Sequence, residues 1–384
     1  MAARSTRTIA VVTGTRAEFG LLRPVMRAIE AHSALRLRVV AAGAHFLPPV
    51  RTIREVEHEF AVAAKVRMQR TRKTDRAADA AATGRGIEGF ARAFARLKPD
   101  WVVVLGDRIE AFAAASAASI GGLAVAHIHG GDRAEGIADE AMRHAITKLS
   151  HLHCAATKQS AERIRRMGER AGHVHVTGSP AIDGLAAIAP MDDRRARELG
   201  DPRVVVLLHP SGLRPADERR IAAMAAGVAA AHPTLWLAPN HDPGREVIEA
   251  ARSGFGPRRV SAWEALGHLP REEFVGMLKR LAARRGLLLG NSSAGLIECA
   301  ALGVRVVNIG PRQDGRERGP NVIDIGLGQV GSLGSAVGRA LGASRPRPSA
   351  VFGDGRAGER IAALLADPRL DPRSAALLRK RNVY

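Results

Sequence analysis

The feature that most constrains the fold is an alternation of short apolar runs with longer segments of helical periodicity. The runs are continuously apolar, which is typical of strands buried on both faces of a parallel sheet. We expect strands at residues 8–13, 37–42, 101–105, 123–128, 173–176, 204–208, 235–238, 287–289 and 304–309. We expect helices between them, among others at residues 21–31, 78–97, 138–149, 158–167 and 218–231. Repeated strand–helix alternation predicts right-handed βαβ units and an α/β fold.

A break in this alternation divides the chain into two halves. Residues 181–202 hold no convincing strand and carry a charged patch at 192–197, and the alternation restarts at Val204. We therefore predict two Rossmann-like doubly wound domains, residues 1–184 and 185–384, with the last helices free to pack back on the first domain. Ligands of such folds bind at the carboxyl ends of strands and between domains, so we expect an active site in an interdomain cleft.

The composition excludes several classes of protein. The chain has 384 residues and a formal net charge of +20, carried mostly by arginines spread through the helical segments. Aromatic residues make up only 3%, too few for a base-stacking platform, so we expect no nucleic-acid partner. We interpret the charge as an arginine- and alanine-rich composition in which some basic residues meet an anionic small ligand.

The cysteines and the apolar segments bear on the compartment. The two cysteines, Cys154 and Cys299, cannot form a disulfide framework, so we expect a cytoplasmic protein. The apolar run at residues 9–12 is too short for a signal peptide. The uncharged run at residues 111–131 is broken by serines and glycines, so it predicts a buried helix followed by a strand, and we expect no membrane association.

One motif imitates a dinucleotide-binding site. Residues 84–89 match G-x-G-x-x-G, but that fingerprint needs a strand before it and a helix that begins on it. The preceding residues are helix-like, so we interpret the segment as a helix start or an interrupted helix. No G-x-x-x-x-G-K-[ST] sequence occurs, and we expect no cofactor.

Charge-rich clusters follow apolar strands or lie on a helix between residues 105 and 144. They contain Asp107, Arg108, His127, His129, Asp139, Glu140, Arg143 and His144. Surface ion pairs at i,i+4 would explain Asp139 with Arg143 or Glu140 with His144, but not the whole cluster. His127 and His129 would suit zinc, yet no third ligand with a supporting motif accompanies them, so we expect no metal. The alternative is imidazoles that transfer protons or contact phosphate.

Two further segments suit an anionic ligand. Arg16 follows Gly14 where a helix begins after the first strand, so it stands near backbone N–H groups that could bind an anion. Ser292 and Ser293 lie between a strand and a helix, where their hydroxyls could hold phosphate oxygens; plain helix capping would explain only one of them. Glu298 could accept hydrogen bonds from both hydroxyls of a ribose. No G-x-S-x-G elbow supports a serine hydrolase.

Together these segments resemble the hydrolysing UDP-N-acetylglucosamine 2-epimerases of the bacterial sialic-acid and legionaminic-acid pathway type. The resemblance covers roughly residues 8–363 and implies two domains of the glycosyltransferase B type. It is carried by GTRAEFG at 14–20, LGDRIEA at 105–111, HIHGGD at 127–132, DEAMRHAITKLSHLH at 139–153, GNSSAGLIE at 290–298 and NIGPRQDGRERGPNVID at 308–324.

The resemblance also implies roles for individual residues. Positions that hold the UDP moiety match Arg16, Arg108, His209, Asn240, Ser292, Ser293, Glu298 and Arg312. Reaction-centre segments match Asp107, Asp139, Glu140, Arg143, His45, His127, His129 and His144. We choose Asp107, with Asp139 or Glu140, for the carboxylate chemistry, and His129, Arg143 and His209 as further catalytic residues. Which carboxylate is the base stays open.

The implied reaction converts UDP-N-acetylglucosamine and water to N-acetylmannosamine and UDP through a glycal. The 2,4-diacetamido-trideoxy analogue is an alternative substrate. Non-hydrolysing 2-epimerases usually carry glutamate where His129 stands, which favours hydrolysis here, and a glycosyltransferase of the same fold is a further alternative. Departures from the family pattern occur around His45, at Asp132 and after His209-Pro210. We expect a UDP-sugar as partner and a homo-oligomer, dimer or tetramer.

Overall fold

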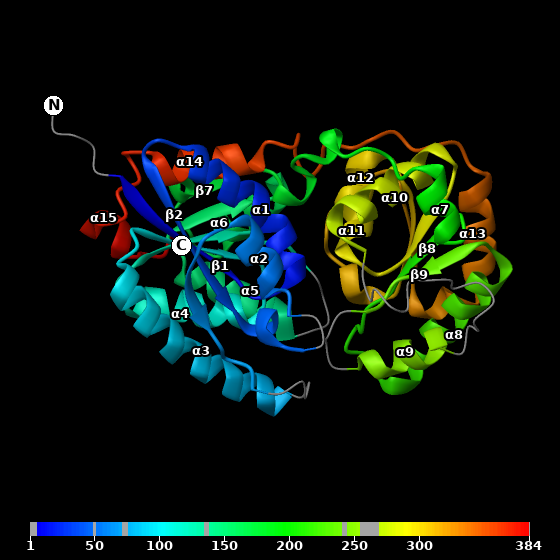
Figure 1. Ribbon diagram of the computed structural model, residues 1–384, viewed down its shortest axis with the longest axis horizontal. Coiled ribbons are helices and arrows are strands. Elements are labelled where there is room, and N and C mark those ends of the chain that lie inside the picture. The colour runs from blue at the N-terminus through cyan, green and yellow to red at the C-terminus, as the bar shows by residue number, and fades with distance from the viewer. Residues whose placement is uncertain are drawn as a thin grey trace. The chain divides into compact units, whose positions relative to one another are not determined.

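The chain forms two compact units, which Figure 1 shows as a ribbon. The computed structural model describes residues 6–48, 51–70, 76–133, 138–239, 244–253 and 269–383, without the side chains of 138 and 139. Unit 1 contains Met1–Asp132, Ala138–Asp183 and Gly353–Tyr384, and unit 2 contains Arg133–Ile137 and Gly184–Phe352. The last segment of the chain therefore belongs to the same unit as the first.

Unit 1 is built on a seven-stranded parallel sheet with the order β3-β2-β1-β4-β5-β6-β7. The strands are β1 (Arg7–Thr13), β2 (Leu35–Ala42), β3 (Val62–Val66), β4 (Trp101–Leu105), β5 (Ala124–Ile128), β6 (Leu152–Ala155) and β7 (Val174–Val176). Its helices include α1 (Arg16–Ala31), α2 (Ile53–Glu59), α3 (Arg76–Leu97), α4 (Ile109–Ile120), α5 (Ala138–Leu149), α6 (Lys158–Arg166), α14 (Ala357–Ala366) and α15 (Ala375–Leu378).

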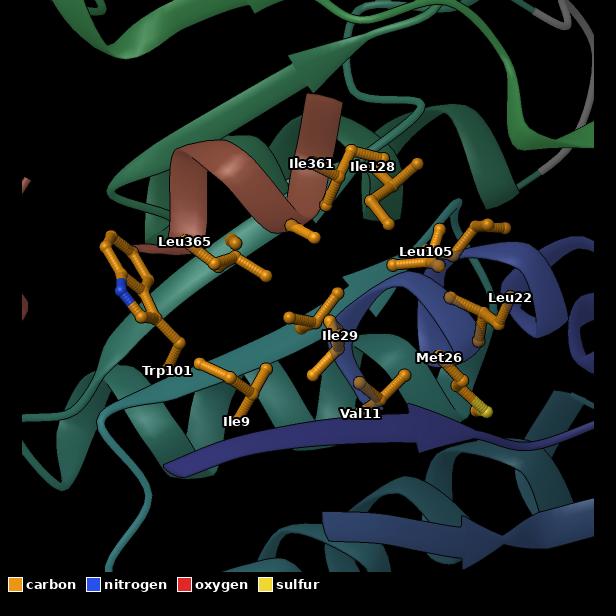
Figure 2. Packing of buried hydrophobic residues seen from close by; sticks show 14 of the residues in the cluster. Ile9, Val11, Leu22, Met26, Ile29, Trp101, Leu105, Ile128, Ile361 and Leu365 are labelled. Atoms are coloured by element: carbon orange, nitrogen blue, oxygen red, sulfur yellow. The ribbon is translucent and has the colours of Figure 1, made fainter. Parts of the chain in front are cut away.

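Both faces of this sheet are covered by helices, which explains the continuous apolar runs. Ile9 and Val11 of β1 face one layer, where they pack with side chains of α1 and α14 such as Ile29 and Leu365 (Figure 2). Ala10 and the other alternate residues of β1 face the opposite layer, formed by α3 and α4. The inner strands therefore carry apolar side chains on both faces, as the continuous runs of β1 and β4 show.

Unit 2 repeats this plan on a five-stranded parallel sheet with the order β12-β11-β10-β8-β9. The strands are β8 (Val204–Leu207), β9 (Thr234–Trp236), β10 (Leu287–Gly290), β11 (Arg305–Ile309) and β12 (Val322–Ile325). The helices include α7 (Asp193–Glu198), α8 (Pro215–Ala231), α9 (Arg245–Ser253), α10 (Arg271–Ala283), α11 (Ser293–Leu296), α12 (Glu298–Leu302) and α13 (Leu333–Gly342). Val204 and Val206 pack with α8 and α13, whereas Val205 packs with α7 and α10.

The predicted α/β class with two Rossmann-like domains is confirmed. All nine predicted strands are present, and β3, β6 and β12 were not predicted. The predicted cleft between the domains stays a prediction. None of the helices in the described ranges combines the length and the apolar character that a bilayer crossing needs.

The G-x-G-x-x-G segment lies inside α3, so its helical character is confirmed. The interpretation as a helix start or an interrupted helix is wrong, because α3 begins at Arg76 and continues to Leu97. The glycines allow α3 to pack closely against its neighbours. A Cβ on Gly86 would lie 2.9 Å from the Ala113 side chain of α4, and one on Gly89 would lie 2.7 Å from Cγ1 of Val66. α3 can therefore lie close to α4, its neighbour in Figure 1, and to β3.

Two glycines of α3 allow a matched test of this packing. Alanine at either position should gain up to about 1 kcal/mol of helix propensity. A Cβ on Gly84 meets nothing within 4 Å, so Gly84→Ala should raise the free energy of unfolding. Gly89→Ala should instead lower it by about 1–3 kcal/mol, because the added methyl overpacks against Val66. Urea unfolding measures both; equal effects of the two substitutions would contradict the packing role.

Candidate functional site

The loop after β1 is organised by a helix cap. The Thr15 hydroxyl accepts a hydrogen bond from the N–H of Glu18 (3.2 Å), and the Glu18 carboxylate accepts one from the N–H of Gly14 (3.0 Å). The first bond satisfies an N–H group in the first turn of α1 that has no partner within the helix, and the second fixes the Gly14 loop to that turn. Arg16 is the first residue of α1, and its Nε donates to the Glu55 carboxylate at 3.1 Å.

His45 ties the end of β2 to the end of β1. Its Nε2 lies 2.9 Å from the Thr13 hydroxyl and its Nδ1 lies 2.8 Å from the Thr52 hydroxyl. The ring is fully buried, and burial lowers its pKa to about 4, so the imidazole is neutral at pH 7. Both ring nitrogens are therefore engaged inside unit 1, which suits a positioning role.

Glu110 is a buried carboxyl group that the sequence analysis did not single out. It is fully buried in the first turn of α4, and its side chain lies against the backbone of Gly14 and Gly43. A Cβ on either glycine would lie 2.5 Å from Cγ of Glu110. The nearest opposite charge is Arg108, whose Nε is 3.6 Å from a Glu110 oxygen, and neither carboxylate oxygen has a hydrogen-bond partner among the described residues. The two glycines thus make room for a carboxylate that holds an arginine.

The carboxyl group of Glu18 also contacts Gly14, and its pKa depends on Glu110. Burial and, to a smaller extent, the nearby Glu110 carboxylate raise the pKa of Glu18 to about 7. The Arg108 charge and the hydrogen bonds from Gly14 and Thr15 act in the opposite direction without cancelling this effect. The first turn of α1, which includes Arg16, therefore contains an acid that keeps its proton up to about neutral pH.

Two carboxylates converge on one buried arginine at the ends of β4 and α5. Arg143 is only 2% exposed; it forms ion pairs with Asp107 and with Glu140 (3.2 Å). Its Nη1 also donates to the backbone carbonyl of Asp132 at 2.8 Å. The second oxygen of Glu140 lies 3.3 Å from Nε2 of His144. Arg143 thus holds both carboxylates in place, and each keeps 21% of its side-chain surface exposed and open to a ligand.

His127 supports the turn that carries Asp107. Burial lowers its pKa to about 3, so the ring is neutral. Its Nε2 lies 2.8 Å from the carbonyl oxygen of Gly106, and since a carbonyl only accepts, Nε2 is the donor. Nδ1 then accepts from the Thr147 hydroxyl at 3.2 Å. His127 therefore joins the β4–α4 turn to the last turns of α5.

His129 is held by two side chains. Its backbone has a φ of +64°, its Nδ1 lies 3.0 Å from the Asp132 carboxylate, and its Nε2 lies 2.9 Å from the Ser179 hydroxyl. The other Asp132 oxygen accepts from the Ser160 hydroxyl at 2.8 Å. A non-glycine residue in the left-handed region is uncommon, and here the surrounding contacts hold it there.

In unit 2 one buried amide organises the ends of three strands. The side chain of Asn291 accepts from the backbone N–H of His209 (2.7 Å), donates to the His209 carbonyl (2.8 Å) and donates to Ser211 (2.9 Å). The Asn291 carbonyl accepts from Arg312 at 3.1 Å and from Gln313 at 2.9 Å. Asn291 is 1% exposed, so it joins the ends of β8, β10 and β11 without contacting solvent.

The serines and Glu298 lie on the short helices that follow β10. The Ser292 hydroxyl caps α11 by accepting from the N–H of Ala294 at 3.3 Å, and Ser293 is the first residue of that helix. Glu298 begins α12, is 5% exposed and lies 3.4 Å from the Arg271 guanidinium. Plain capping therefore accounts for Ser292, while Ser293 has no such role in the described geometry.

The structure groups the predicted residues by unit. At the carboxyl edge of the first sheet and on adjacent helices lie Arg16, His45, Asp107, Arg108, His127, His129, Glu140, Arg143 and His144. At the corresponding edge of the second sheet lie His209, Ser292, Ser293, Glu298 and Arg312. Asn240 and the side chain of Asp139 lie outside the described residues. Within the described ranges, no group of three or more His, Cys, Asp or Glu side chains is placed to hold a metal ion.

Comparisons with known proteins agree with this arrangement. A family model described as UDP-N-acetylglucosamine 2-epimerase matches residues 27–366. A Legionella pneumophila protein named UDP-N,N'-diacetylbacillosamine 2-epimerase (hydrolyzing) is 33% identical over 98% of this chain and 100% of its own length. A Neisseria meningitidis UDP-N-acetylglucosamine 2-epimerase is 30% identical over 82% of each chain.

Solved structures share the fold. The crystal structure of a Neisseria meningitidis UDP-GlcNAc 2-epimerase bound to UDP-GlcNAc has a TM-score of 0.74 at 20% identity, covering 93% of this chain and 99% of that one. A Methanocaldococcus jannaschii UDP-GlcNAc 2-epimerase in complex with UDP-GlcNAc and UDP has the same TM-score at 19% identity, with the same coverage.

The raised pKa of Glu18 predicts a pH-dependent stability. The unfolded chain releases this proton near pH 4.5 and the folded protein near pH 7, so the free energy of unfolding should fall between these values as pH rises. Glu18→Gln keeps an oxygen for the N–H of Gly14 and removes this loss, so the variant should gain about 3 kcal/mol on the wild type between pH 4.5 and 7.

Urea unfolding at a series of pH values measures this gain. Glu162→Gln, at an exposed position of α6, serves as the control for removing a surface carboxylate. A constant difference between Glu18→Gln and the wild type over this pH range would contradict the assigned protonation.

Proposed function

Because the chain belongs to the UDP-N-acetylglucosamine 2-epimerase family, we propose that it is a hydrolysing 2-epimerase acting on a UDP-linked 2-acetamido sugar. The observation that carries this proposal is the pair of carboxylates, Asp107 and Glu140, held by the buried Arg143. The name of the Legionella pneumophila relative, a hydrolysing 2-epimerase, supports the hydrolytic outcome.

The chemistry begins with removal of the proton on C2 of the sugar. Asp107 or Glu140 accepts this proton, for which an ionised carboxylate in hydrogen-bond reach is required. The electron pair of the C–H bond forms the C1–C2 double bond, and the C1–O bond breaks so that UDP leaves with its electrons. The product of this step is a glycal. Arg143, paired with both carboxylates, holds them in position before the reaction.

The departing diphosphate needs positive groups and hydrogen-bond donors. Arg16 and Arg108 in unit 1 and His209, Ser293 and Arg312 in unit 2 supply such groups in this proposal. Charge developing on the leaving oxygen is stabilised most effectively by donors already in place. Glu110, through Arg108, and Asn291, through His209 and Arg312, provide this pre-organisation.

Hydration completes the reaction. Water adds its hydroxyl to C1 of the glycal, and a proton returns to C2 on the face opposite to the one it left, which inverts C2. The second carboxylate of the pair takes the proton that the water gives up on adding to C1 and delivers it to C2, while the first carboxylate releases the original C2 proton to solvent with the departing UDP. Atoms balance because one water is consumed and UDP and the free 2-epimeric sugar are released.

Two substrates of this class are candidates. UDP-N-acetylglucosamine is supported by the family description and by the Neisseria meningitidis relative. UDP-N,N'-diacetylbacillosamine is supported by the Legionella pneumophila relative, which this chain matches over its full length. Incubating the protein with each sugar nucleotide in deuterated water and following the reaction by NMR tests both. Deuterium at C2 together with free UDP supports the proposal, and transfer without exchange at C2 contradicts it.

Asp107→Asn tests the carboxylate assignment. The substitution removes the charge that pairs with Arg143 and leaves the proposed diphosphate contacts in place. We expect glycal formation to fall by at least about a hundredfold, the scale of a positioned general base, while the Kd for UDP changes little. Calorimetry with UDP and NMR detection of the glycal measure the two quantities. Full activity of this variant would exclude Asp107 from the chemistry.

A further inference from the structure

The segment that follows α15 places a lysine at the C-terminal end of α5. Nζ of Lys380 donates to three backbone carbonyls, those of Thr147 (2.9 Å), Lys148 (2.7 Å) and Ser150 (2.5 Å). It also forms an ion pair with Glu169 at 2.8 Å. The last carbonyls of a helix have no partner within the helix, and a cation there meets the negative end of the helix dipole. Lys380 therefore caps α5 from a position 233 residues away from Thr147 in the sequence.

The cap is part of a buried ion cluster. The side chain of Glu169 is only 4% exposed, and it accepts from Lys148 at 2.7 Å as well as from Lys380. Lys148 also donates to Asn382 at 2.6 Å, so a second contact holds the same segment. Burial lowers the pKa of Lys380 to about 8, although Glu169 acts in the opposite direction, so the ammonium form predominates at pH 7.

The helix that Lys380 caps carries part of the candidate site nearer its other end. Glu140 and Arg143 lie in the first two turns of α5, and Arg143 also pairs with Asp107. Glu140 and Thr147 are seven residues apart, which corresponds to about 10 Å along the helix axis. Because a helix moves as a stiff rod over this length, an anchor at its end restricts where Glu140 and Arg143 can lie.

A second connection runs through hydrogen bonds. The Thr147 carbonyl accepts from Lys380, and the Thr147 hydroxyl donates to Nδ1 of His127 at 3.2 Å. Nε2 of His127 donates to the carbonyl of Gly106 at 2.8 Å, and Gly106 directly precedes Asp107 in the chain. The cap is therefore joined to both carboxylates of the pair, to one through α5 and to the other through His127.

We propose that Lys380 is a positioning residue for the reaction, acting through the C-terminal end of α5. The inference rests on the proposed function, in which Asp107 and Glu140 must be held within reach of C2. Removing the ammonium would leave helix carbonyls and the buried Glu169 carboxylate without this partner, so the end of α5 should fray. Reacting groups lose their alignment when such a support is lost, even if substrate still binds.

A cysteine substitution allows the ammonium to be removed and then restored. Lys380→Cys removes it, and alkylation of the introduced thiol with 2-bromoethylamine restores an ammonium on a side chain of equal length. Iodoacetamide gives a neutral side chain for comparison. The thiols of Cys154 and Cys299 are buried, so the introduced thiol reacts selectively in the folded protein. The matched control is Arg381→Cys, at the next, exposed position, treated in the same way.

We expect kcat for UDP release by Lys380→Cys to fall by about tenfold to a hundredfold, with KM within about twofold of the wild type. Aminoethylation should restore most of the lost kcat, and iodoacetamide should not. The control should keep the wild-type kcat under each treatment. Lys380→Arg keeps the charge on a broader head group, so it should lose less in the same direction, and it replaces Lys380→Cys should that variant not fold.

Amide hydrogen exchange tests the cap without any substrate. Exchange in residues 142–149 should become at least about tenfold faster in Lys380→Cys and recover on aminoethylation, while exchange in α1 stays unchanged. A wild type that releases no UDP from either sugar nucleotide would refute the proposed function. An active wild type with unchanged kcat in Lys380→Cys, equal losses in Arg381→Cys, equal recovery with both reagents, or equally faster exchange in α1 would overturn the role of Lys380.

Discussion

Burial of both faces of each parallel sheet is the constraint on which the rest of this protein depends. Because helices cover both faces, the strands have no side free for polar chemistry, and functional groups gather where the strands end. Parallel pairing sends those ends to one edge. His45, Asp107 and His129 come from three different strands of unit 1 and reach the same edge for this reason alone.

The buried polar groups at these edges mainly form hydrogen bonds with other parts of the protein. The side chains of His127 and Asn291 are buried, and each joins segments that follow different strands. Hydrogen bonds in such low-dielectric surroundings are costly to leave unmade, so they fix the loops that present Asp107 and His209. In unit 1 the same principle applies to charge: Glu18 keeps a proton up to about neutral pH mainly because it is buried, and the nearby Glu110 adds to the effect.

The strands that could be predicted from the sequence are mostly those that form a continuous apolar run, such as β4 and β8. β3 and β12 were missed because a charged residue interrupts each apolar run, Lys65 in β3 and Asp324 in β12. β6 was missed for another reason: it carries His153, which is buried through a hydrogen bond to Glu169 at 3.1 Å that no local pattern reveals.

The candidate site was predictable only in part, for a related reason. Residues such as Arg16 and Glu140 stand in motifs next to strand or helix ends, and their spacing is visible in the chain. Glu110 and Asn291 stand in the same motifs, but their roles depend on partners far away in sequence, Gly43 for one and His209 for the other. Contacts of this kind depend on the order of the strands in the sheet, so they cannot be predicted from the spacing of residues in the sequence.

The return of the chain's last segment to unit 1 has a consequence for how the protein is made. Ile361 and Leu365 of α14 pack into the same core as Ile9 and Val11 of β1, so that core lacks a wall until residues 357–366 have left the ribosome. The sequence of residues 184–352 emerges complete before then. During translation the second unit can therefore complete its core first. Until α14 follows, the strands of unit 1 expose apolar surface, and this is when chaperones are most needed.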